Sequence, residues 1–272
     1  MSINRLGLSQ TDIAVMADAL GDSPAAVTLR LEERPWSFLD LLEHPDIVQK
    51  VLEPATPLQS DASPHLYFAV LTQKAAADLR HTSVVNDWAG VGQRLPVFDV
   101  DPLREFIEAP GRVVFVASLL TRFCHIPDLP APVSALDMEG LADWLEMAEP
   151  DDRVTLLCHL GDLALFSSGV MADQTGPRPF GPLTAERLGR TLDLNSGEIL
   201  RLVDPASFSP GIDAMESLGP SWYRAATDQD ANGRLSLVVN DIASRFRSAR
   251  RFLNHLADCY LNPLEPDLGI IL

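Results

Sequence analysis

The stretch from residue 234 to residue 261 constrains the fold of this chain more than any other part of the sequence. It contains neither glycine nor proline, the residues that most often interrupt a helix. Its apolar side chains recur at steps of three and four, at Leu235, Val239, Ile242, Phe246, Ala249, Leu253, Leu256 and Tyr260. Because an α-helix has about 3.6 residues per turn, these side chains lie on one face. We therefore predict one long helix with a single apolar face.

Capping residues and prolines predict further helices. Ser9, with Asp12 three residues later, opens a helix that ends at Gly21, and Ser23-Pro24 opens the next one. Helices are also expected over residues 37–42, 45–52, 64–80, 101–108, 110–124, 134–149, 151–170, 184–191, 197–203 and 210–227. No alternating pattern of useful strand length occurs, and the region 81–100, which has no clean period, is expected to be irregular or helical in its first half. The predicted fold class is all-α, a bundle-like globule of roughly ten helices.

The Gly/Pro-rich segment 173–182 is the clearest break in the pattern. We expect a single helical domain over residues 1–272. The alternative is two packed lobes, 1–172 and 183–261, joined at this segment.

Composition excludes several classes of partner. The net charge is −17, which opposes binding to nucleic acids and to anionic membrane surfaces but leaves room for a basic protein partner. No apolar run approaches the ~20 residues of a spanning helix. The first ten residues, MSINRLGLSQ, lack the apolar core of a signal peptide. Three cysteines cannot form a disulfide framework, so we expect reduced, buried thiols in a cytoplasm.

Four arginines within the predicted long helix are the first candidate site: Arg245, Arg247, Arg250 and Arg251. The last three fall on about one helix face, whereas Arg245 is turned away and can reach Asp241 one turn earlier. One interpretation is an anion site for a phosphate, a carboxylate ligand or an acidic partner loop. The other, which the acidic composition favours, is ion pairing with carboxylates of the same chain.

Two sets of residues resemble metal sites. Asp228, Asp230 and Asn232 open a D-x-D-x-N-G calcium loop, but Val239 stands where the bidentate glutamate belongs, which favours a polar turn. His255 and Cys259 share a helix face and could reach one ion, although buried thiols with hydrogen-bonded histidines are the favoured interpretation. We expect no bound metal and no cofactor.

The first two helices have part of the spacing of a helix-turn-helix. Asp22 and Arg30 stand where packing residues belong, and acids outnumber bases there, so two ordinary helices are favoured. The chain also lacks the G-x-S-x-G, Walker A, G-x-G-x-x-G and H-E-x-x-H motifs. Their absence favours a protein that is not an enzyme.

Three runs, LGDLALFSSGV (160–170), GPSWYRAA (219–226) and FLNHLADCYL (252–261), resemble an uncharacterised all-helical family of bacterial proteins. The resemblance covers roughly residues 150–261. It implies a helical fold and a bacterial origin, and it implies no activity.

These observations lead to two functional hypotheses. The first is a non-enzymatic protein of the bacterial cytoplasm that acts through protein contacts, including those of a homodimer. The second is a binding protein or enzyme for an anionic small molecule, with a pocket between helices that uses Arg247, Arg250 and Arg251.

Overall fold

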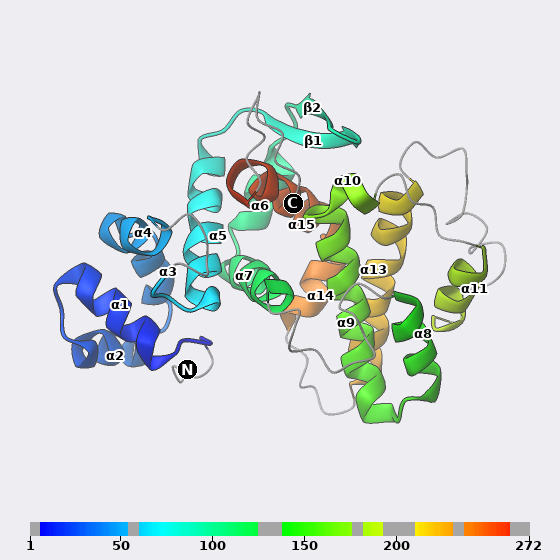
Figure 1. Ribbon diagram of the computed structural model, residues 1–272, viewed down its shortest axis with the longest axis horizontal. Coiled ribbons are helices and arrows are strands. Elements are labelled where there is room, and N and C mark those ends of the chain that lie inside the picture. Colours follow the sequence, from blue (N-terminus) through cyan, green and yellow to red (C-terminus); the bar gives the residue numbers. More distant parts are fainter. Residues whose placement is uncertain are drawn as a thin grey trace. The chain divides into compact units, whose positions relative to one another are not determined.

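The computed structural model describes residues 6–53, 60–124, 138–175, 182–192, 210–230 and 237–261. These ranges hold 14 α-helices, one π-helix and one two-stranded sheet (Figure 1). The predicted all-α fold class is therefore confirmed. Contacts group the chain into two compact units: unit 1 is Met1–Thr82 with Ile107–Cys124, and unit 2 is Ser83–Phe106 with His125–Leu272.

Unit 1 is built on two long helices, α5 (Pro64–Arg80) and α7 (Pro110–Cys124), which pack against each other. Four shorter helices complete it: α1 (Gln10–Leu20), α2 (Pro24–Glu33), α3 (Ser37–Leu42) and α4 (Pro45–Leu52). Its core consists of fully buried apolar side chains, among them Met16, Leu31, Phe38, Ile47, Leu66, Val70 and Val116. The predicted bounds of α3, α4, α5 and α7 are all confirmed.

The start and end of α1 also follow the prediction. Ser9 is the N-cap and shares a capping box with Asp12, while Gly21 ends the helix in the left-handed conformation with φ 68°. That conformation favours glycine because it has no Cβ.

One buried carboxylate, that of Asp12, joins the starts of two helices. Its oxygens accept hydrogen bonds from the backbone N–H and the hydroxyl of Ser9, both at 2.8 Å. They also accept from the backbone N–H and the hydroxyl of Ser63, the N-cap of α5, at 2.8 and 2.9 Å. The side chain therefore satisfies donors at the starts of α1 and α5 at once.

Unit 2 contains the hairpin strands β1 (Val85–Gly90) and β2 (Gln93–Val97) and nearly all of α6 (Asp101–Ile107). It continues with α8 (Met138–Met147), α9 (Pro150–Gly169), α10 (Ala172–Thr175), α11 (Pro182–Arg190), α13 (Pro210–Gln229), α14 (Leu237–Ser244), α15 (Phe246–Leu256) and the π-helix η4 (Ala257–Leu261). The closest helix pair is α9 with α13 (Figure 1). Trp222 and Tyr223 of α13 are completely buried in its core.

The predicted lobes, 1–172 and 183–261, are not the units that the contacts define. Helices α9 and α13, on either side of the Gly/Pro-rich segment, pack against each other in unit 2. Whether the chain forms one domain or two packed lobes stays a prediction. Residues 176–181 lie outside the described ranges, as do the expected helix 197–203 and residues 234–236.

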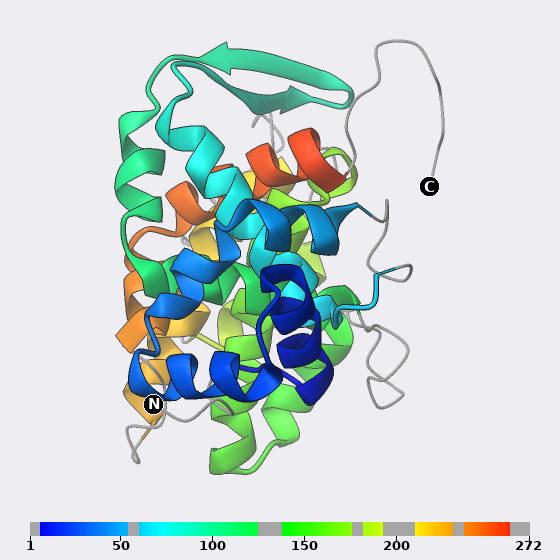
Figure 2. The same ribbon diagram turned by 90° about the vertical axis from the view of Figure 1, so that its left-hand side faces the viewer.

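The prediction for region 81–100 is wrong, because the hairpin of β1 and β2 lies there (Figure 2). The strands pair antiparallel, with Val85 opposite Val97, and the turn places Gly92 at φ 65°. Neither strand buries alternate side chains, so the usual period-two pattern is missing from the sequence.

The predicted long helix is interrupted, which corrects the expectation of one continuous helix over 234–261. Arg245, between α14 and α15, has φ −120° and ψ 25°. The Ser244 hydroxyl donates to the carbonyl of Asp241 at 2.7 Å, and the Arg245 N–H is shared between the carbonyls of Asp241 and Ile242. Such competition by a serine side chain bends helices.

We expect Gly219→Ala to lower the free energy of unfolding by about 2 kcal/mol, although alanine normally favours a helix over glycine. A Cβ at Gly219 would overlap the Phe246 ring and lie 3.1 Å from the Cβ of Ala164 in α9. Thermal and urea unfolding of the variant measure the loss. In a protein that already carries Phe246→Leu, Gly219→Ala should lower the free energy of unfolding by less than it does in wild type. A Gly219→Ala protein that is more stable than wild type would contradict the close packing.

Candidate functional site

The structure gives each of the four predicted arginines a carboxylate partner within unit 2. Arg250 is the most buried, with 6% of its side chain exposed. Its Nε donates to Oε1 of Glu216 in α13, and its Nη1 donates to Oδ1 of Asp87 in β1 at 3.2 Å. One guanidinium thus joins α15 to α13 and to the hairpin.

Arg251 shares the same carboxylate of β1. Its Nε lies 3.0 Å from Oδ2 of Asp87, and its Nη2 donates to the carbonyl of Asp99 at 3.3 Å. Asp87 therefore lies between two guanidinium groups. This pairing stabilises its charge in a half-buried position.

The other two arginines are more exposed. Arg245 lies 2.8 Å from Oε1 of Glu105 in α6 and 3.5 Å from Asp241, the partner predicted one turn earlier. Arg247 is 78% exposed and its Nε is 3.9 Å from Glu216. The geometry of all four thus matches ion pairing within the chain, and their use for a bound anion stays a prediction.

A second ionic cluster, which the sequence did not suggest, holds the hairpin at its other strand. Arg94 in β2 makes paired hydrogen bonds to Asp258 in η4, at 2.6 and 2.9 Å. It also donates to both oxygens of Asp173 in α10, at 3.0 and 3.2 Å. Asp173 further accepts from the Trp88 indole at 2.7 Å and from the N–H of Gly92.

The electrostatics of this cluster follow from its geometry. The hydrogen bond from Arg94 to Asp258 raises the pKa of the Arg94 guanidinium, although burial of that group acts in the opposite direction. Burial acts to raise the pKa of the Asp173 carboxyl, but hydrogen bonds from Arg94, Trp88 and Gly92 outweigh it and lower that pKa. Both groups are charged near neutral pH, so this cluster is a structural clamp.

The metal-like patterns are not assembled into a ligand set in the described part of the chain. There, no three His, Cys, Asp or Glu side chains come close enough together to hold an ion. Asp228 lies in the last turn of α13 and Asp230 directly follows that helix, whereas Asn232 lies outside the described residues. The calcium loop is therefore not tested.

His255 and Cys259 do meet, as their spacing predicted. The Sγ atom of Cys259 lies 3.6 Å from Nδ1 of His255, across the junction of α15 and η4. His255 is 9% exposed, but Cys259 is exposed, so the expectation of a buried thiol at this position is wrong. The pair is thus a contact between a buried base and an accessible sulfur.

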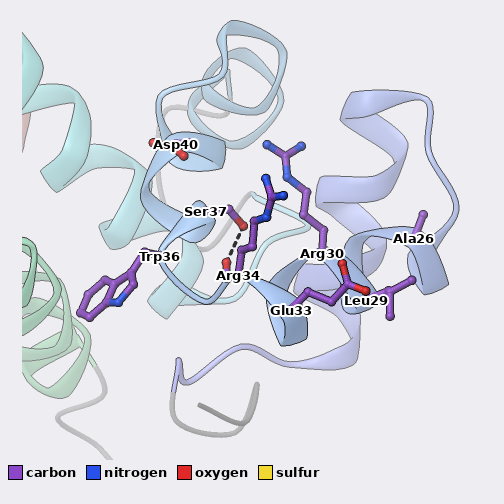
Figure 3. Close-up of a pocket in the computed structure, with 8 residues that line it drawn as sticks. All are labelled: Ala26, Leu29, Arg30, Glu33, Arg34, Trp36, Ser37 and Asp40. Atoms are coloured by element: carbon purple, nitrogen blue, oxygen red, sulfur yellow. Dashed lines mark hydrogen bonds between the residues drawn. The ribbon is translucent and has the colours of Figure 1, made fainter.

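A groove between α2 and α3 in unit 1, of about 720 Å³, is lined by Ala26, Leu29, Arg30, Glu33, Arg34, Trp36, Ser37 and Asp40 (Figure 3). Leu29 is 55% exposed and Trp36 63%. Arg30 and Arg34 are four residues apart, and Figure 3 draws their guanidinium groups pointing the same way, while Glu33 points elsewhere. Within the described residues neither guanidinium has a carboxylate within ion-pair distance.

Unit 2 has a smaller groove, of about 500 Å³, between α8 and α9. Trp144 and Met147 line its apolar part, and Glu149 and Asp152 supply its charge. It lacks a cation among its lining residues, so its chemistry differs from that of the groove between α2 and α3.

The chain matches no protein-family model, no curated protein and no solved structure. None of the helices in the described ranges combines the length and apolar character that crossing a bilayer requires. The assignment of a function therefore rests on the chemistry of the surfaces described above.

Proposed function

We propose that this chain acts through protein–protein contacts and that the groove between α2 and α3 is a contact surface. The observation that carries the proposal is the grouping of Trp36 and Leu29, both exposed, with Arg30 and Arg34. The proposal includes action in a bacterial cytoplasm without a cofactor. The partner is another protein or a second copy of the chain.

The residue types support this use of the groove. Tryptophan and arginine are enriched at the energetic centres of protein interfaces, and the groove between α2 and α3 presents both residue types. Trp36 and Leu29 offer apolar area that a partner would remove from water. Arg30 and Arg34 offer guanidinium groups that need no existing ion pair to be broken first.

The same features suggest what the partner segment contains. Trp36 and Leu29 lie at opposite ends of the groove (Figure 3), so two apolar side chains of the partner would cover them. A carboxylate between these side chains would pair with Arg30 or Arg34. The alternative hypothesis, an anionic small molecule on the face of Arg247, Arg250 and Arg251, receives less support. Those guanidinium groups already have carboxylates beside them.

Trp36→Ala should weaken partner binding or self-association at least tenfold, or about 1.4 kcal/mol, while leaving thermal stability nearly unchanged. Self-association is measured by light scattering over a concentration series, and partner binding by capture on the immobilised full chain followed by titration of the captured protein. Trp144→Ala, which removes a partly exposed tryptophan from unit 2, is the matched control and should retain binding.

Two outcomes count against this proposal. One is a strict monomer that captures no partner. The other is equal binding by the Trp36→Ala and Trp144→Ala proteins, which would move the contact surface away from the groove between α2 and α3.

A further inference from the structure

The contact between Cys259 and His255 has the geometry of an assisted thiol. The separation of 3.6 Å between Sγ and Nδ1 allows the thiol proton to pass to the imidazole. Burial fixes the ring of His255 in the wall of unit 2, while Cys259 stays exposed to small molecules. A buried packing cysteine would lack this access.

The turn that carries Cys259 is held in place. Cys259 belongs to the π-helix η4, and the residue before it, Asp258, is fixed by the paired hydrogen bonds from Arg94. Short π-helical segments are rare and occur frequently at functional sites.

A second cysteine of the same chain provides a comparison. Cys124, at the end of α7 in unit 1, is also exposed. Partial burial of its thiol nevertheless raises the pKa of that thiol. No imidazole is within hydrogen-bond distance of its sulfur among the described residues. The sulfur of Cys259 thus has an imidazole beside it, and among the described residues the sulfur of Cys124 does not.

We propose that Cys259 is a redox modification site, at which a hydroperoxide oxidises the thiol with the help of His255. Nδ1 of His255 takes the thiol proton, and the thiolate sulfur attacks one peroxide oxygen. An S–O bond forms while the O–O bond breaks, and the leaving oxygen departs with the bonding pair and takes the proton from His255. Sulfur is oxidised by two electrons to a sulfenic acid, and the peroxide is reduced to water or an alcohol.

The test treats the reduced full chain with hydrogen peroxide in the presence of dimedone, which traps sulfenic acids. Peptide mass spectrometry then gives the labelling rate of each cysteine in the same molecules. Cys259 should be labelled at least about tenfold faster than Cys124. Rates within threefold of each other would overturn the proposal without the use of any variant.

The His255→Gln variant tests the role of the imidazole. It should reduce the labelling rate of Cys259 toward that of Cys124 and leave Cys124 unchanged, with retained helical content as the check on folding. A folded variant whose Cys259 still reacts at the wild-type rate would also overturn the proposal. The Trp36→Ala protein should be labelled like wild type, since this site does not depend on the groove between α2 and α3.

Discussion

The Arg250→Ala variant should lose about 3 kcal/mol of unfolding free energy. The substitution leaves the carboxylate of Glu216 without its closest guanidinium and removes one of the two that flank Asp87. Burial makes the loss large, because a desolvated charge without a partner is far less favourable than one in water. The expected loss lies at the low end of the range for broken buried ion pairs, because Arg251 still pairs with Asp87 in the variant. Urea unfolding followed by circular dichroism measures it.

Arg247→Ala is the matched control, because it removes the same residue type from the same helix and beside the same carboxylate. Its side chain is 78% exposed, so the loss should stay within about 0.5 kcal/mol. The anion-binding hypothesis expects another pattern: inorganic phosphate would raise the unfolding temperature of wild type, and Arg247→Ala would abolish the increase. We expect phosphate to leave that temperature unchanged.

The Asp12→Ala variant should also lose about 3 kcal/mol, through the start of two helices in unit 1. The carboxylate accepts four hydrogen bonds from Ser9 and Ser63, the N-caps of α1 and α5. Without it, the backbone N–H groups of both serines lose the buried carboxylate that accepts their hydrogen bonds. Loss of a single cap typically accounts for about 1 kcal/mol, so the loss of four hydrogen bonds at two linked caps gives more.

The control for this prediction is Asp18→Ala in the same helix. Asp18 is exposed and its partner, Lys50, is exposed as well, so no measurable change is expected. The loss of unfolding free energy in Ser63→Ala should lie between the losses in Asp12→Ala and Asp18→Ala. If Asp12→Ala unfolds at the same urea concentration as Asp18→Ala, the carboxylate does not link the two helices in solution.

The sequence predicted those elements whose ends depend on neighbouring residues. Ser9 and Gly21 bound α1 through capping that involves only residues within one turn. Likewise, Pro64 opens α5 and Pro110 opens α7 at the predicted positions. Local steric and hydrogen-bonding rules suffice for such boundaries.

The hairpin could not be predicted in this way. Its strands are held by contacts with residues far along the chain, since Arg94 and Asp258 are 164 positions apart and Asp87 and Arg250 are 163 apart. The pattern of β1 and β2 lacks an alternating apolar face that would reveal a sheet. The arginine cluster shows the same limit: its helix face was predicted, but its partners on β1, α6 and α13 depend on tertiary structure.

The long separation within these ion clusters has a consequence for the order of folding. Closing a loop of this length is entropically unfavourable until other contacts bring its ends together. We therefore expect the helices α9, α13 and α15 to assemble before Asp87 and Arg94 reach their partners. The hairpin docks late, and it is the part of unit 2 that we expect to open first when the protein fluctuates in the native state.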